Sequence, residues 1–554
     1  MPGIPFQRQQ PHFDTRVPVD FVVVGSGAAG GVMAKELSTA GFDVVVLEQG
    51  PYRTPQQFTH DEIGGRIGRG LGASFDGDPQ SFRKNEDEET ETRRCVYYLR
   101  MVGGTSVHFT ANYWRFHEVD FIERSLLGPI AGTGFADWPI TYAELEPYYT
   151  KVDWEIGVSG APGPHDPPRS RPYPMPPLPV KSSGVLLERA ARTLGWHAAP
   201  APMAILSQTY NGRPPCIHCG FCMSYGCEAN AKSSSLVTMI PLAEASGHCE
   251  IRPESTVYRI ETDASGRASE VVYFDRDGTE QAQRCKAVVV CANGAETPRL
   301  LLMSESNRFP DGLANSQGVV GRYLMGNGQV HVYGHFEHPL NEYKSVQVTR
   351  IILDLYKSDP ARGFYGGGGM DARFQYYPVG FATSGLPPDA PRWGSDYKRM
   401  LGDYYTRTID VNGHTTTIPM ASNNITLDPE NKDTFGRPGL RVTYTDHPDD
   451  LAVQHFFIER CTELAEAMKP LKIWHREVRE TRGFAHLLGT CRMGTDPTTS
   501  VIDKYHRTHD VPNLFLCDGS SLVSSGRGQP TMTIQALAFR AADHIIAFAR
   551  RGEI

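Results

Sequence analysis

The chain has 554 residues, of which 40% are hydrophobic and 21% are charged, and its formal net charge is −8 at pH 7. This composition is typical of a globular protein and excludes a disordered chain, a coiled coil and a collagen-like fibre. Without a basic excess to neutralise phosphates, nucleic acid is not expected as a partner. No apolar stretch reaches the roughly 20 residues of a membrane span, and residues 1–20 lack the apolar segment of a secretory signal.

The first elements along the chain form a predicted strand–helix–strand unit. Residues 21–24 are a short β-branched run, which is typical of a buried parallel strand. A glycine-rich turn follows at residues 25–30, and small residues continue with helical character to Leu37. Residues 43–48 then predict the second strand.

The glycine-rich turn predicts a dinucleotide site. Gly25 permits a tight turn, Gly27 lets the backbone approach a pyrophosphate, and Gly30 allows the helix to pack closely on the strand. The helix N-terminus then faces the phosphates, and Glu48 at the end of the second strand can accept hydrogen bonds from ribose hydroxyls. This spacing does not distinguish NAD from FAD.

The remaining chain divides into segments of different character. The charged run at 84–94 predicts a solvated loop, and residues 162–179, with nine prolines, predict an extended connector on the surface. Residues 248–292 predict short strands, and residues 329–480 predict a largely antiparallel sheet with few long helices. Residues 531–550 have apolar residues at helical spacing and predict a helix packed on the first domain.

Two further segments favour FAD over NAD. Residues 101–110 (MVGGTSVHFT) contain Gly103, Gly104 and Ser106, and residues 289–298 (VVCANGAETP) end a strand at a turn of small residues. Together with the nine residues HLLGTCRMG that begin at His486, the pair Asp518-Gly519 and the stretch QPTMT that begins at Gln529, they resemble the glucose–methanol–choline (GMC) flavin oxidoreductases.

The resemblance extends from Val19 to the C-terminus. Residues 137–160 are most similar to the branch of gluconate and glycoside dehydrogenase large subunits and pyranose oxidases. The implied fold is α/β (α+β overall), with a Rossmann-like FAD-binding domain over 16–328 that carries the connector and a cysteine-rich loop as an insertion at 162–235. A substrate domain built on a largely antiparallel sheet is expected over 329–480, and residues 481–554 return to the first domain with the catalytic histidine.

Alcohol oxidation by hydride transfer needs a base for the hydroxyl proton and a flavin for the hydride. Histidine suits the first role because its pKa lies near neutrality, and the resemblance implies that His486 is this base. The family usually places a second His or Asn further along the chain, where this sequence has Gln529. Gln529 has an acceptor and two donors that could hold the substrate hydroxyl. Equally, it could contact only the helix N-terminus while another group positions the substrate.

The resemblance also assigns contacts to the flavin. Asp518 and Gly519 match residues at the ribityl and pyrimidine end, and Val257 matches the strand whose backbone meets the adenine. In several relatives a histidine at the place of His108 is bonded covalently to the flavin ring. A covalent link and noncovalent packing beside the ring are both open for His108.

Four cysteines lie within twelve residues: Cys216, Cys219, Cys222 and Cys227. A structural zinc site normally uses two cysteine pairs separated by a longer loop, whereas this tight spacing favours a loop wrapped around an iron–sulfur cluster. Some relatives carry such a cluster between the flavin and an external electron acceptor. A metal-free cysteine-rich loop and, less favoured, a zinc site are the alternatives.

The sequence therefore predicts an FAD-dependent oxidoreductase acting on the CH–OH group of a sugar or glycoside. The favoured hypothesis is a dehydrogenase that oxidises a secondary hydroxyl, with C3 of a pyranose as the specific guess. An oxygen-using oxidase, a redox-neutral lyase and a noncatalytic flavoprotein are the alternatives. The resemblance implies a small partner subunit and a cytochrome-type electron acceptor, and it leaves both a cytoplasmic location and export to the periplasm with that partner open.

Overall fold

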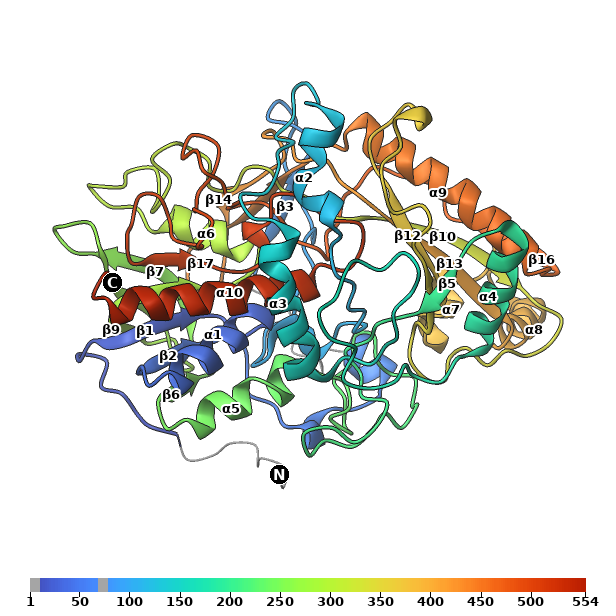
Figure 1. Ribbon diagram of the computed structural model, residues 1–554, viewed down its shortest axis with the longest axis horizontal. Coiled ribbons are helices and arrows are strands. Elements are labelled where there is room, and N and C mark those ends of the chain that lie inside the picture. Colours follow the sequence, from blue (N-terminus) through green and yellow to red (C-terminus); the bar gives the residue numbers. More distant parts are fainter. Residues whose placement is uncertain (1–9, 68–77) are drawn as a thin grey trace.

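The computed structural model describes residues 10–67 and 78–554, and its described strands form three β-sheets (Figure 1). The first is a seven-stranded sheet whose central strands are parallel. Its strands, in spatial order, are β6 (Cys249–Arg252), β2 (Val44–Leu47), β1 (Val19–Val24), β9 (Glu280–Val290), β8 (Ala268–Phe274) and β7 (Thr256–Thr262), and β17 (Leu514–Leu516) pairs with the end of β9.

The central strands are apolar because they are buried in the core of the domain, with helices packed over the sheet. All four residues of β2 are buried, and so are five of the six in β1. The covering helices are α1 (Ala28–Thr39), α3 (Tyr142–Val152), α5 (Ile240–Ala245) and α10 (Thr531–Arg550). α1 packs on α10 and α5, and Figure 1 shows α10 running along the front of the sheet.

The second sheet is antiparallel throughout. Its strands, in spatial order, are β16 (Lys472–His475), β10 (Gly328–His335), β13 (Thr408–Thr415), β12 (Gly368–Arg373), β11 (Arg350–Ile352) and β5 (Ala198–Pro200). Helices α4 (Ser182–Leu194) and α9 (Pro448–Ala467) cover one face of this sheet (Figure 1).

Apolar and polar side chains alternate along the central strands of the second sheet, as period-two geometry requires. The apolar members pack under α4 and α9, so the other face is polar. The polar residues are His331 on β10, Asp371 and Arg373 on β12, and Asp410, Asn412 and His414 on β13.

The third sheet joins β14 (Asn424–Lys432) and β15 (Pro438–Thr443) to β3 (Gln80–Arg83) and β4 (Glu91–Thr92). The remaining α-helices are α2 (Glu118–Leu127), α6 (Glu296–Met303), α7 (Pro378–Ser384) and α8 (Gly394–Tyr405). Short 3₁₀ or π turns are η1 (Pro55–Gln57), η2 (Glu62–Ile67), η4 (Gly104–Val107), η5 (Asp153–Gly157), η6 (Ser235–Val237), η7 (Pro360–Arg362) and η8 (Gly519–Ser521).

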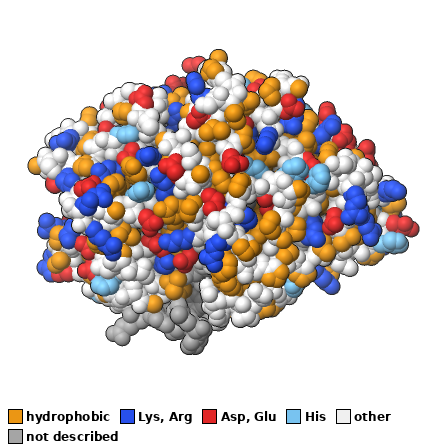
Figure 2. Space-filling view, in the orientation of Figure 1, with side chains coloured by type: hydrophobic (Ala, Val, Ile, Leu, Met, Phe, Trp, Pro, Cys, Tyr) orange, Lys and Arg blue, Asp and Glu red, His pale blue; other side chains and the backbone are white. Residues whose placement is uncertain are grey.

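The surface carries charges of both signs. On the face drawn in Figure 2, basic and acidic side chains are interspersed, and no large patch of one sign stands out. Among the described residues, no helix is long and apolar enough to cross a membrane.

The predicted α/β class with an antiparallel second sheet is confirmed, as are the first strand–helix–strand unit and the C-terminal helix. Two expectations were wrong in detail. The region 329–480 contains the 20-residue helix α9, and its hairpin β14–β15 joins the third sheet through β3. The proline-rich connector does not lie wholly on the surface, because the side chains of Tyr173, Met175 and Leu178 are buried in the core.

Candidate active site

A cleft of about 1300 Å³, including space open to solvent, lies at the carboxyl ends of the parallel strands, the usual location of ligands in open α/β sheets. Residues from both ends of the chain line it. The predicted site residues in its wall are Gly25, Gly27, Glu48, Gly104, Ser106, Val257, His486, Asp518 and Gly519. Gly30, Gly103, His108 and Gln529 do not line this cleft.

The glycine-rich turn has the close contacts that its sequence predicts. Gly25 has a φ of +92°, and a Cβ added there would lie 2.6 Å from the carbonyl oxygen of Cys291. A Cβ on Gly30 would lie 2.0 Å from the carbonyl oxygen of Gly25, and one on Gly104 would lie 2.7 Å from the Cα of Gly27. These positions admit only glycine unless the backbone moves.

The N-terminus of α1 opens on the same cleft. Its N-cap, Gly27, provides no side-chain hydrogen bond, and the first turn contains no acidic residue. The first N–H groups of a helix have no partner within the helix, and its dipole favours an anion there. The turn and helix therefore fit the pyrophosphate of a dinucleotide.

Glu48 holds this turn in place from the end of β2. It is 5% exposed, and its carboxylate accepts hydrogen bonds from the N–H and hydroxyl of Ser26, at 3.1 and 2.7 Å, and from the N–H of Gly50 at 2.9 Å. Burial raises the pKa of Glu48. The Ser26 hydroxyl in turn accepts from the N–H of Gly103 at 3.1 Å, so Glu48 links the two glycine motifs.

Asp518 fixes the opposite wall of the cleft. Its carboxylate accepts from the N–H of Asn293 at 3.0 Å, the hydroxyl of Thr297 at 2.6 Å and the N–H of Ser520 at 2.8 Å. A Cβ on the adjacent Gly519 would lie 2.3 Å from the carbonyl oxygen of Leu487. Asp518 and Gly519 thus hold η8 against the segment that carries His486.

His486 lines the cleft with one imidazole edge bound to Asn327. Its Nδ1 lies 2.7 Å from the side-chain oxygen of Asn327. The Asn327 amide nitrogen donates to the carbonyls of Thr415, Ser525 and Gly526 at 3.1–3.3 Å, which fixes the orientation of the amide. The oxygen of Asn327 must then accept from Nδ1–H, and Nε2 of His486 carries the free lone pair.

The protonation state of His486 follows from its surroundings. The pKa of His486 is lowered to about 4, mainly by burial and to a smaller extent by the nearby His414, and a hydrogen bond with Gln529 opposes both effects. The imidazole is therefore neutral at pH 7, which is the state required of a base. Gln529 also approaches the polar face of the second sheet, because its amide nitrogen lies 3.4 Å from Nδ1 of the fully buried His414.

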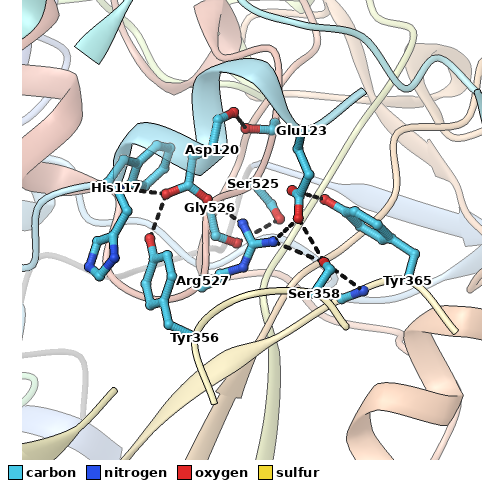
Figure 3. Close-up of polar contacts among 12 residues, drawn as sticks. His117, Asp120, Glu123, Tyr356, Ser358, Tyr365, Ser525, Gly526 and Arg527 are labelled. Atoms are coloured by element: carbon cyan, nitrogen blue, oxygen red, sulfur yellow. Dashed lines mark hydrogen bonds and ion pairs between the residues drawn. The ribbon is translucent and has the colours of Figure 1, made fainter. Parts of the chain in front are cut away.

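A buried ion cluster anchors the segment next to Gln529 (Figure 3). The guanidinium of Arg527 lies between the carboxylates of Asp120 and Glu123, both on α2. The hydroxyl of Tyr356 donates to Asp120 at 2.6 Å, and that of Tyr365 donates to Glu123 at 2.7 Å.

This cluster fixes the backbone that orients Asn327. The carbonyls of Ser525 and Gly526, which bind Asn327, immediately precede Arg527 in the chain. Neither Asn327 nor Arg527 was predicted from the sequence. Asn327 lies 159 positions before His486, and no motif signals either residue.

His108 lies behind the cleft wall. Its ring packs edge-on against Phe58 with 6.2 Å between centroids, and burial lowers its pKa to about 3. Within the described part of the chain, its Nδ1 has no hydrogen-bond partner. Its carbonyl accepts from the N–H of Ser224 at 2.7 Å, which ties it to the cysteine-rich loop.

The four clustered cysteines line one small cavity behind that wall. All eleven cysteines are free thiols, and within the cluster Cys219 is exposed while Cys222 is buried. Lys232 closes the cavity: its ammonium donates to the carbonyls of Phe109 at 3.0 Å and Tyr225 at 2.7 Å, and burial lowers its pKa to about 8. Phe109 lines the large cleft, so its hydrogen bond with Lys232 links the two cavities.

The spacing of these thiols bears on what they could bind. No three of the four sulfurs lie within 4.8 Å of one another. Tetrahedral zinc, with Zn–S bonds of about 2.3 Å, requires sulfurs about 3.8 Å apart. The loop is therefore too open for a single zinc ion, whereas a multi-iron cluster has a wider ligand shell.

The chain is similar to known proteins along most of its length. Family models described as GMC oxidoreductase match residues 19–325 and 419–538. The chain is 35% identical to the 2-methyl-1,2-propanediol dehydrogenase of Mycolicibacterium austroafricanum, over 95% of each chain. It is 29% identical to the fructose dehydrogenase large subunit of Gluconobacter japonicus, over 96% of this chain and 98% of that one. A formate oxidase structure from Aspergillus oryzae has a similar fold, with a TM-score of 0.66 at 15% identity over 98% of this chain and 100% of that one.

Proposed function

The chain belongs to the GMC oxidoreductase family, and on that premise we propose that it is an FAD-dependent dehydrogenase that oxidises a secondary hydroxyl of a sugar or glycoside to a ketone. The observation that carries this proposal is the neutral His486, with its Nδ1 bound to Asn327, in the wall of a dinucleotide cleft. C3 of a pyranose remains our specific hypothesis for the position oxidised.

The described residues fit FAD. The glycine turn and the open N-terminus of α1 would hold the pyrophosphate, Glu48 would face the ribose, and Val257 would lie beside the adenine. When bound, FAD supplies a hydride acceptor next to the substrate carbon. His108 does not line the cleft, so its covalent attachment to the flavin stays a prediction from the sequence.

In the proposed mechanism, Nε2 of His486 takes the proton of the substrate hydroxyl. Asn327 keeps the other ring proton on Nδ1 and orients the ring. Gln529, which is hydrogen-bonded to His486, would hold the same hydroxyl in line with Nε2. The cleft wall around His486 includes Leu487, Leu488 and Ile534, and these apolar side chains would limit water near the reacting carbon.

The polar face of the second sheet supports a substrate rich in hydroxyls. Gln329 and Gln375 are solvent-accessible there, and their amides reach the buried groups beneath them. The amide nitrogen of Gln329 lies 3.4 Å from Nδ1 of His414, and that of Gln375 donates to Asp410 at 3.2 Å. Since each amide offers both donors and an acceptor, this surface suits several neighbouring hydroxyl groups better than a hydrocarbon chain.

A second substrate class is favoured by the relative at 35% identity, which is named for a small diol. A panel that contains pyranoses, glycosides and short vicinal diols would separate the two. Reduction of the flavin by a diol alone, with no response to any sugar, would replace the sugar hypothesis by the diol one.

We also propose that electrons leave through an iron–sulfur cluster held by Cys216, Cys219, Cys222 and Cys227. Three features support it: the four thiols surround one cavity, the N–H of His218 points at the sulfur of Cys216 from 3.3 Å, and the ammonium of Lys232 offsets thiolate charge. Such a cluster would pass electrons singly to an external acceptor.

The exposed side of this loop suggests where an acceptor would dock. Cys219 and the 65% exposed Ile217 lie at the surface. One relative is by name a large subunit, so we expect a small partner subunit and a cytochrome-type acceptor for this chain as well.

The decisive experiment is the visible spectrum of the purified protein before and after anaerobic addition of sugar. Flavin bleaching by a sugar supports the proposal and excludes a redox-neutral lyase.

The His486→Ala variant tests the proposed base. It should keep the flavin and slow flavin reduction by about 10²–10⁴-fold, whereas the control His338→Ala, at an exposed site, should not slow it. A wild-type rate in His486→Ala would remove this residue from the mechanism, and rapid peroxide formation in air would favour an oxidase.

The content of iron and sulfide tests the iron–sulfur cluster hypothesis separately from the dehydrogenase proposal. We expect iron and acid-labile sulfide at one cluster per chain, both lost in Cys222→Ser, with reduction by sugar preserved and transfer to a one-electron acceptor slowed. Flavin without iron after anaerobic preparation would contradict the cluster and leave the alcohol dehydrogenase proposal standing.

A further inference from the structure

Two histidines and an aspartate meet at the edge of the second sheet, away from the cleft. His165 comes from the proline-rich connector, His197 precedes β5, and Asp354 follows β11. The metal-binding atoms of all three lie within 4.8 Å of one another, and no other group of this kind occurs among the described residues.

The sheet holds two of these residues in fixed relation. β5 and β11 are antiparallel neighbours, with Ala198 opposite Ile352, so His197 and Asp354 lie at the same corner. Nδ1 of His197 lies 2.8 Å from Oδ1 of Asp354, and the backbone N–H of His197 donates to Oδ2 at 3.0 Å. The backbone bond orients the carboxylate in the way that outer hydrogen bonds orient metal ligands.

The connector brings the third residue onto this corner. A Cβ added to Gly163 would lie 2.4 Å from that of Ala199, so the chain just before His165 packs directly on β5. Nε2 of His165 lies 3.3 Å from Oδ1 of Asp354. Neighbouring ligands around a tetrahedral ion with bonds of about 2.0–2.2 Å lie about 3.4 Å apart, so the observed separations need only small side-chain adjustments.

We propose that His165, His197 and Asp354 form a binding site for a divalent transition-metal ion of the zinc type. Two imidazoles and one carboxylate suit Zn²⁺, Ni²⁺ or Cu²⁺, whereas Mg²⁺ and Ca²⁺ require more oxygen ligands. The imidazoles are 41% and 57% exposed and the carboxylate 13%, so an ion can enter from solvent and retain water as its remaining ligand. The bound ion would fasten the connector to the second sheet.

The test is a titration of the tag-free holoenzyme with Zn²⁺ by calorimetry, with Mg²⁺ as the comparison ion. The wild type should bind Zn²⁺ at this site and ignore Mg²⁺. His165→Ala and Asp354→Asn should each weaken that binding at least about tenfold. The exposed His338→Ala is the matched histidine control, and Cys219→Ser separates this site from the thiol loop; both should retain it.

X-ray absorption of the Zn²⁺-loaded wild type gives a second readout that needs no variant. Nitrogen and oxygen ligands at about 2.0–2.1 Å would support the proposal, and sulfur at about 2.3 Å would place the ion in the thiol loop. Zn²⁺ should also raise the melting temperature of the wild type but not of His165→Ala. Equal Zn²⁺ binding by the wild type, His165→Ala and Asp354→Asn, or its loss only in Cys219→Ser, would overturn the assignment.

Discussion

Replacing Asn327 by leucine tests whether the tautomer of His486 is set by its partner. Leucine has a similar size but neither accepts from Nδ1–H nor donates to the carbonyls of Thr415, Ser525 and Gly526. The imidazole then loses the hydrogen bond that keeps its proton on Nδ1. A ring with its proton on Nε2 has no lone pair there and cannot take up the substrate proton.

The size of the effect follows from the cost of an unmatched buried donor. Leaving the Nδ1–H group without its acceptor costs about 1–3 kcal/mol, and about 1.4 kcal/mol corresponds to a tenfold change in rate. We therefore expect kcat to fall by about 5- to 150-fold. KM should change little, because neither atom of the Asn327–His486 contact needs to touch the substrate.

The pH profile of flavin reduction gives an independent check on how Asn327 affects the pKa of His486. In the proposed mechanism His486 is a neutral base, so activity should be present above its pKa of about 4 and be lost as pH falls through that value. The bond to Asn327 stabilises the protonated ring, and its removal lowers this pKa further. The loss of rate in Asn327→Leu should therefore be the same at every pH from 5 to 8.

The assay is stopped-flow reduction of the bound flavin by substrate over this pH range, with flavin content measured for each variant. Asn327→Asp retains an oxygen opposite Nδ1, so it should keep more of the rate than Asn327→Leu. A wild-type rate in Asn327→Leu, or equal losses in both variants, would refute the assignment of Asn327 as the residue that orients His486.

Three other substitutions test the scaffold of the site. Arg527→Met should lower the free energy of unfolding, measured by urea titration, by about 3–5 kcal/mol, since it leaves two buried carboxylates uncompensated. Glu123→Gln keeps the ion pair of Arg527 with Asp120, so it should lower the free energy of unfolding less. Glu48→Arg should weaken FAD at least about tenfold, because a buried acceptor of three hydrogen bonds is lost; unchanged affinity by flavin fluorescence would contradict this role. Gly30→Ala should also weaken FAD, as its Cβ would strike the Gly25 carbonyl, whereas Gly402→Ala in α8, with nothing within 4 Å, should leave binding and stability unchanged.

The parts of the fold that local sequence determines were predictable. β1, β2 and α1 follow from an uninterrupted apolar run, a glycine turn and a second apolar run, and α10 follows from helical spacing alone. The helix α9 was not predicted, although it begins with the sequence His-Pro-Asp-Asp, where His447 caps the first turn. Helix α9 contacts the strands β10, β13 and β16 as well as α4, so its apolar stripe is broad and gives a weak periodic signal.

The site residues also fall into two groups, those that lie in recognisable sequence motifs and those that do not. His486, Glu48 and the glycines belong to contiguous motifs, and each can be found by scanning the chain. Asn327 reaches His486 from the start of β10, and Arg527 finds its partners about 400 positions earlier on α2. These contacts join segments that lie far apart in the chain, and no local pattern encodes them.

In the proposed site, the path of the proton and the path of the electrons that an alcohol loses on oxidation are separate. The proton would go to His486, whose partners Asn327 and Gln529 come from the side of the second sheet and the Arg527 segment. The electrons would leave on the other side of the wall at residues 104–109, where His108 and Phe109 are bonded to the cysteine-rich loop through Ser224 and Lys232. Asn327 and Gln529 form their hydrogen bonds with His486 and with groups on the side of the second sheet. Changes in the cysteines should therefore alter reoxidation and leave the pH profile of flavin reduction unchanged. A pH profile of flavin reduction that shifts in Cys222→Ser would show that the two paths are coupled.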